Sequence, residues 1–122
     1  MDDGYNRVGT FFQFASVNNA VAVIVLPTNN LYGIIIRTCI LTINSGAIVT
    51  VGSLIADTVA PANANSGRII ASAAATANTT VSQIVPYEIF VPPGLGLWWA
   101  ANASAAASAN SVTLTYDLVQ PA

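Results

Sequence analysis

Few residues of this chain could take part in acid–base or metal chemistry. Its 122 residues include no histidine and no lysine, and the charged ones are three arginines and five acids: Arg7, Arg37, Arg68, Asp2, Asp3, Asp57, Glu88 and Asp117. Glu88 and Asp117 could form an acid–base pair of the glycosidase type only if their strands were neighbours. The sequence offers no imidazole and no carboxylate cluster for a metal ion. We therefore expect a protein that is not an enzyme and that needs no cofactor.

Cys39 is the single cysteine, so no disulfide can form within the chain. Its place in the apolar run 34–43 predicts a buried and inert thiol, because a reactive thiol needs a cation or a helix N-terminus nearby. Arg37 is two residues away, and residues at that spacing share a face on a regular strand. We therefore expect Arg37 and Cys39 on the same face.

Hydrophobic residues make up 54% of the chain and charged residues only 7%, with a net charge of −2. A chain this apolar has ample surface to bury, which predicts one folded domain and excludes disorder. Three arginines are too few for the several phosphate contacts that nucleic-acid binding requires. The longest apolar runs, 20–26 and 34–43, are shorter than the ~20 residues of a membrane-spanning helix. We expect neither a nucleic acid nor a membrane as partner.

β-branched residues dominate, with 13 Val, 12 Ile and 11 Thr, and they favour strands over helices. Asn44-Ser45-Gly46 gives the strongest hairpin signal among the turns. Pro86 lacks an N–H group, which predicts that its strand is broken, bulged or at an edge. Many short strands with no amphipathic helix between them predict an all-β sandwich or barrel. The eight expected strands are 10–15, 20–26, 31–43, 47–56, 68–75, 80–91, 95–101 and 111–120.

The last of these strands alternates regularly between apolar and polar residues. Val112, Leu114, Tyr116 and Leu118 lie on one face, and Ser, Thr and Asp residues lie on the other. The alternation predicts that the first face is buried.

Two expected strands are apolar on both faces, over 20–26 and 34–36. Without helices to cover the second face, the expected cover is another copy of the chain or a different protein. Ile24, Ile34 and Ile36 are therefore candidate interface residues.

Trp98 and Trp99 are adjacent, so on a strand one ring faces the core and the other faces away. The outward ring has three interpretations: a loop covers it, it anchors an interface, or it stacks on a sugar. Because tryptophan is enriched at the centres of interfaces, both residues join the candidate interface set.

The segments 87–99 and 111–118 carry a recognisable pattern. A strand ends in Pro92-Pro93-Gly94, a Gly-Leu-x-Trp strand follows, and an alternating strand closes the chain. Over about a third of the sequence this resembles the C-terminal half of small jelly-roll proteins of tailed-phage virions, such as capsid decoration (cement) proteins and fibre or knob domains. Jelly-roll trimers of the tumour-necrosis-factor type are similar in shape.

This resemblance implies an eight-stranded, jelly-roll-like antiparallel β-sandwich over residues 10–122, preceded by a flexible N-terminal arm over residues 1–9. The implied function is that of a capsid decoration protein, a homotrimer that binds the major capsid protein lattice and stabilises the head. Its implied location is the capsid surface of the virion, after synthesis in the host cytoplasm. The alternative is a phage tail or fibre protein, or a receptor-binding jelly-roll module that recognises carbohydrate.

Overall fold

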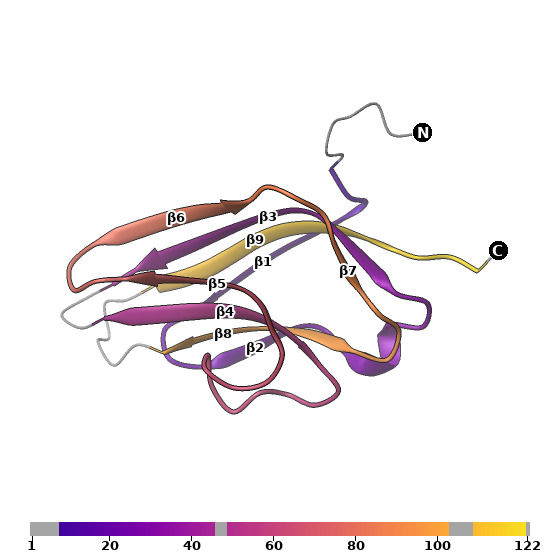
Figure 1. Cartoon of the computed structure of the whole chain (residues 1–122), viewed down its shortest axis with the longest axis horizontal. Helices are drawn as coiled ribbons and strands as arrows, with labels where there is room; N and C mark the ends of the chain where they lie inside the picture. The colour runs from indigo at the N-terminus through magenta and orange to yellow at the C-terminus, as the bar shows by residue number, and fades with distance from the viewer. Residues whose placement is uncertain (1–7, 46–48, 103–108, 122) are drawn as a thin grey trace.

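Two antiparallel β-sheets lie face to face in the computed structural model, which describes residues 8–45, 49–102 and 109–121 (Figure 1). The all-β prediction is confirmed, and no helix in these ranges is long and apolar enough to span a membrane. The elements are β1 (Phe11–Val17), β2 (Val21–Val25), the single 3-10 turn η1 (Pro27–Asn29), β3 (Ile34–Asn44), β4 (Thr50–Asp57), β5 (Ile69–Ala75), β6 (Thr80–Val85), β7 (Ile89–Val91), β8 (Gly96–Asn102) and β9 (Ala109–Leu118).

The strand order is that of a jelly roll. Sheet A has the order β1-β9-β3-β6, with β7 also paired to β3, and sheet B has the order β2-β8-β4-β5. Counting β6 and β7 as one interrupted strand leaves eight strands, and the chain crosses between the sheets after β1, β2, β3, β5, β7 and β8. The predicted jelly-roll-like sandwich is therefore confirmed.

Pro86 interrupts the expected strand 80–91, as its missing N–H predicts. β6 ends at Val85, opposite Cys39, and β7 resumes at Ile89, opposite Ile36. Both pieces pair with β3 at the edge of sheet A, where a break costs the fewest hydrogen bonds.

The predicted hairpin at Asn44-Ser45-Gly46 is wrong. β3 and β4 belong to different sheets, because β3 already pairs with β9 on one edge and with β6 and β7 on the other. No edge of β3 is left for β4. At the end of β3 the Ser45 N–H donates to the Thr79 carbonyl at 2.9 Å. Gly46 itself lies outside the described residues.

The core lies between the sheets and is formed by the inward faces of their strands. In β9, Val112 and Leu114 are fully buried, and Tyr116 and Leu118 pack partly buried against the same core, as the alternation predicts. Trp99 reaches the core from sheet B, and its indole N–H donates to the Asn110 carbonyl at 3.0 Å.

The long connection between β4 and β5 covers the middle of the outer face of sheet B, over β4 and β8. Ala64 of this connection packs against Ile55 and Ala100 in a second buried cluster. Ser53 Oγ donates to the Ala64 carbonyl at 2.6 Å, and the Ala64 N–H donates to Asn102 Oδ1 at 3.1 Å. These two bonds hold the connection on the sheet, so the apolar outward residues of β4 and β8 are buried by the chain itself.

The predicted N-terminal arm, residues 1–9, lies outside the described residues except for Val8 and Gly9. The Gly9 N–H donates to Thr115 Oγ1 at 2.9 Å, and the Thr10 N–H donates to Asp117 Oδ1 at 2.7 Å. The chain therefore already contacts β9 before β1 begins.

Leu114→Ala is expected to lower the free energy of unfolding by about 2–5 kcal/mol, because it leaves a cavity in a fully enclosed site. Val112→Asp is expected to abolish folding, since the new carboxylate would be buried without a partner. Thr113→Val, on the outward face between them, is the matched control and should stay within about 0.5 kcal/mol of wild type. Urea unfolding measures all three. A wild-type midpoint for Leu114→Ala would contradict the inward assignment of β9.

Candidate functional site

Arg37 occupies a β-bulge in β3. Ile36 and Thr38 lie opposite consecutive residues of β9, so Arg37 between them is the extra residue. The bulge inverts the alternation of the strand, and Cys39 faces the core while Arg37 makes its ion pairs on the outer side of sheet A. The expectation that Arg37 and Cys39 share a face is therefore wrong.

Arg37 joins the two carboxylates that the sequence singled out. Its Nε donates to Asp117 Oδ2 at 2.9 Å, and its terminal nitrogen donates to both carboxylate oxygens of Glu88 at 3.0 Å. These three residues form the Arg37 network, which ties the turn before β7 to the end of β9. Glu88 and Asp117 are thus brought to one site, although β3 lies between their segments.

The Arg37 network is built to keep Asp117 ionised. The Thr10 backbone N–H, followed by the Arg37 guanidinium, lowers the pKa of Asp117 to about 2 from its ordinary value of 3.8. The hydrogen bonds to Asp117 and then to Glu88 raise the pKa of Arg37. A general acid needs a raised pKa so that it can hold its proton near neutral pH. The shift at Asp117 has the opposite sign, so Asp117 is ionised at neutral pH and is a salt-bridge partner of Arg37.

Cys39 is buried in the core, and burial raises the pKa of its thiol to about 11. The prediction of a buried thiol is confirmed.

The described residues contain no group of three or more side chains that could hold a metal ion.

The structure shows where each ring of the tryptophan pair lies. Trp99 is fully buried in the core, and Trp98 on the opposite face of β8 is also buried. A Cβ atom on Gly96 would lie 2.6 Å from the Trp98 ring and 2.7 Å from the ring of Pro27, so both rings close tightly over this glycine. The outward ring is therefore covered within the chain.

The aliphatic interface candidates are also packed within the chain. Ile34 and Ile36 point into the core and are fully buried, and Ile24, beside a register shift in β2, packs half-buried against the same core. This corrects the expectation that Trp98, Trp99, Ile34 and Ile36 present their side chains to a partner: each is covered by the opposite sheet or by a neighbouring loop.

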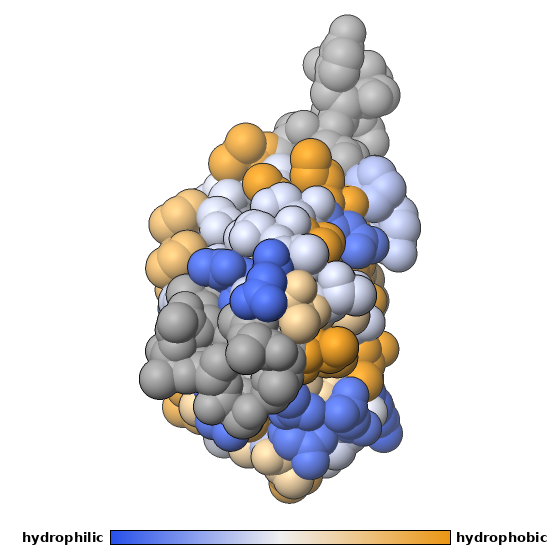
Figure 2. Space-filling view, turned by 90° about the vertical axis from the view of Figure 1, so that its left-hand side faces the viewer, coloured by the Kyte–Doolittle hydropathy of each residue, from blue (hydrophilic) through white to orange (hydrophobic). Residues whose placement is uncertain are grey.

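The bare apolar surface lies instead on the outer face of sheet A. Phe14, Thr113, Ile40 and Ile84 are in register across four neighbouring strands, and we call them the outer row. Phe14 is 58% exposed and Ile84 is 67% exposed, whereas Ile40 in the middle of the sheet is partly shielded by its neighbours. In Figure 2 hydrophobic residues reach the surface at the top of the molecule, the side on which Figure 1 shows sheet A.

Aromatic and hydroxyl side chains extend the outer row. Phe12, 65% exposed, lies two residues from Phe14 on the same face of β1. On the other side of the row, Ser16, Ser111, Thr42 and Ser82 form a parallel line of hydroxyls across the same four strands. The outer face is thus a flat sheet surface of apolar and uncharged polar side chains, bounded by the Arg37 network.

Sequence reasoning missed the outer row, although a signal for it was present. Phe12 and Phe14 alternate with Gln13 and Ala15, which predicts an aromatic face on β1. The alternation does not indicate which of the two faces of β1 is covered by the opposite sheet.

No family model, curated protein or solved structure matches this chain. The resemblance to jelly-roll proteins of phage virions therefore stays a prediction.

The free energy of unfolding should fall in acid, over a pH range set by the pKa of Asp117. Its pKa is lower in the folded chain than in the unfolded chain, so its stabilising contribution is complete above about pH 4 and is lost as the pH falls towards 2. Asp117→Asn should reduce this acid-dependent loss, and Asp57→Asn, which leaves the Arg37 network intact, should retain it. Urea unfolding at several pH values measures the effect. A carboxyl titration of Asp117 near pH 4 in wild-type protein would contradict it.

Cys39 should resist thiol reagents in the folded protein. Burial both blocks access and disfavours the thiolate, which is the reacting species. We expect no reaction with a chromogenic disulfide at pH 8 and one equivalent of released thiol after addition of denaturant. Rapid labelling of native protein would mean that the core opens at β3.

Proposed function

We propose that this chain is a virion structural protein of the capsid-decoration type, which associates with further copies of itself and binds the major capsid protein lattice. One observation carries the proposal: the outer row and its neighbours form a bare apolar face on sheet A, whereas on sheet B the outward apolar residues of the central strands, such as Ile55 and Ala100, are covered by the chain itself. A protein that works by assembly needs such a face, and it needs no reactive side chains.

The exposed side chains are those that stabilise protein interfaces. Phe12, Phe14, Ile84 and Phe90 are all more than half exposed on the outer side of sheet A. Aromatic residues are enriched at interface centres, and contiguous apolar patches on soluble chains mark interaction sites. Removing them from water gains about 25 cal/mol for each Å² of apolar surface.

The charge of this face favours another copy of the chain as the occupant. The acids at the boundary of this face, Glu88 and Asp117, are bound by Arg37. The outer row and the neighbouring line of hydroxyls carry only apolar or hydroxyl side chains. The face therefore offers little to a strongly basic or acidic partner. Only 7% of the residues are charged, so the different surface that a neighbouring copy presents to this face in a closed ring is also nearly uncharged.

The resemblance at 87–99 supports the trimer and the capsid as its place of action. Jelly rolls recur in viral capsid domains, and this support is an analogy at the level of the fold. Closed rings of identical subunits fit the symmetry axes of a capsid lattice. At such an axis each copy would stabilise neighbouring capsid subunits through buried area alone, on the outside of the virion.

Light scattering over a range of concentrations tests self-association. Wild-type protein should have three times the 12.5 kDa mass of one chain. Ile84→Glu should reduce the mass to that of a monomer, because it places a carboxylate in the proposed interface. Val59→Glu is the matched control, since Val59 is 69% exposed but lies in the β4–β5 connection, and it should assemble as wild type does.

Circular dichroism should show strand content unchanged in both variants. A wild-type monomer at all concentrations would contradict self-association. An unchanged mass for Ile84→Glu would exclude the outer row as the interface, and a stable dimer would correct the trimer.

Binding to capsid shells tests the second half of the proposal. Wild-type protein should sediment with shells prepared without this chain and should raise the temperature at which they rupture. Sedimentation with isolated tails in place of shells would overturn the decoration role and favour the tail or fibre alternative.

A further inference from the structure

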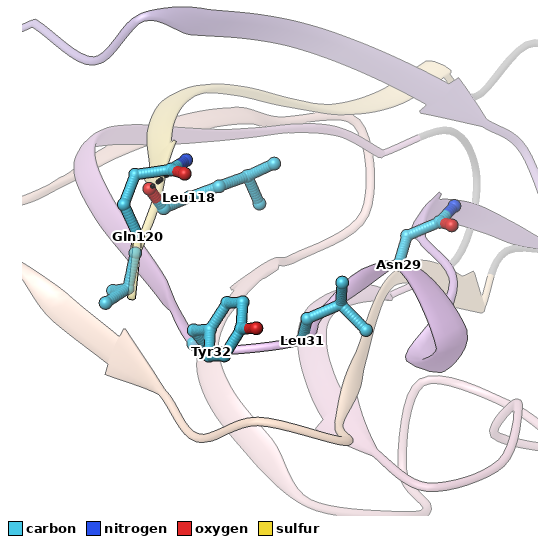
Figure 3. Close-up of a pocket in the computed structure, with 7 residues that line it drawn as sticks. Asn29, Leu31, Tyr32, Leu118 and Gln120 are labelled. Carbon is cyan, nitrogen blue, oxygen red and sulfur yellow. Dashed lines mark hydrogen bonds between the residues drawn. The ribbon is translucent and has the colours of Figure 1, made fainter. Parts of the chain in front are cut away.

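A small hollow lies at the end of the sandwich where the β2–β3 connection meets the segment after β9. Its volume is about 120 Å³. Figure 3 shows Asn29, Leu31 and Tyr32 on one wall and Leu118 and Gln120 on the other. The hollow is separate from the outer row, so an inference about it does not rest on the proposed function.

The first wall is held rigidly by a buried asparagine. Asn30 Nδ2 donates to the carbonyls of Pro92 and Leu95 at 2.7 and 2.9 Å, and Asn30 Oδ1 accepts the Gly33 N–H at 2.8 Å. The Gly94 N–H donates to the Asn30 carbonyl at 3.0 Å. The connection is thereby fixed to the turn before β8, and a ligand would not have to order it on binding.

The second wall is fixed to the first at Gly33. The Val119 N–H donates to the Gly33 carbonyl at 2.9 Å, which fastens the segment after β9 to the connection. Gly33 has φ +115°, and a Cβ atom there would lie 2.5 Å from the Phe90 ring, so only glycine fits between this connection and β7. The floor of the hollow is therefore preformed.

The lining combines apolar surface with neutral hydrogen-bonding groups. Tyr32 is 49% exposed and stands beside the exposed Leu31, which together offer an aromatic and an aliphatic surface. Gln120 is exposed at the rim, and its Nε2 makes a long contact of 3.5 Å to the Leu118 carbonyl, whereas the Asn29 side chain points away from Tyr32 and Gln120 (Figure 3). None of the lining residues carries a charge.

This chemistry selects one class of ligand. A phosphate or a carboxylate would need a cation, which the lining lacks. A purely apolar ligand would leave the Gln120 amide at the rim unused. A sugar ring has C–H faces that pack on Tyr32 and Leu31, and hydroxyls that exchange hydrogen bonds with the Gln120 amide.

The size of the hollow limits how much of a glycan it can take. Pockets that enclose whole drug-sized ligands are larger, at about 300–1,000 Å³. We infer that this hollow beside Tyr32 binds one neutral sugar ring, the terminal residue of a glycan, and leaves the remainder of the glycan in solvent.

The experiment is an NMR titration of the full-length ¹⁵N-labelled protein with the methyl glycosides of glucose, galactose, mannose and N-acetylglucosamine. Sialic acid serves as the acidic comparator. At least one neutral glycoside should shift the amide resonances of Gly33 and Val119, with a dissociation constant on the order of millimolar, because so small a ligand makes few contacts. Sialic acid should bind more weakly.

Tyr32→Ala should weaken the binding about ten-fold, since it removes the aromatic surface. Tyr87→Ala removes an equally accessible tyrosine that does not line the hollow, and its effect should stay below about two-fold. No shift with any neutral glycoside, tighter binding of sialic acid, or wild-type affinity for Tyr32→Ala would each overturn the inference. Light scattering on the same samples reports assembly separately, so failure here is distinguishable from failure of the proposed function.

Discussion

The pairing of β3 on both of its edges is the constraint on which the rest of the structure depends. β9 occupies one edge along nearly the whole strand, and β6 and β7 occupy the other. β4 is thereby excluded from sheet A and begins the second layer, which encloses the core. The same strand carries Leu41 inward and Ile40 outward, so one element positions both the core and the proposed assembly surface.

The two outer faces of the sandwich differ because the chain covers the central strands of only one of them. The β4–β5 connection lies on sheet B and buries Ile55 through Ala64, whereas the outer row on sheet A stays open to solvent. Uncovered apolar area is the usual driving force for association, and the salt bridges of Arg37 remove charge that would oppose it. The covered face therefore belongs to the packing of the domain itself, and the open face is the proposed surface for assembly.

The hollow at the end of the sandwich depends on a different kind of interaction. Buried apolar area holds the sheets together, but directional hydrogen bonds from Asn30 fix the loop that carries Tyr32. Neutral ligands that bind through few contacts need walls that are already ordered. The proposed assembly through the outer row and the proposed ligand binding at the loop end can therefore be tested independently.

The sequence by itself determined the class of the fold, the break at Pro86, the buried thiol of Cys39 and the inward face of β9, because each follows from residue type or from local alternation. Only the tertiary structure decided that β3 and β4 belong to different sheets, that Trp98 is covered, and that Arg37 meets both Glu88 and Asp117. Alternation states which residues share a face but not what lies against that face, and one bulged residue inverts it. Coverage is a sum of contacts between residues far apart in the chain, and these contacts exist only once the strands have paired.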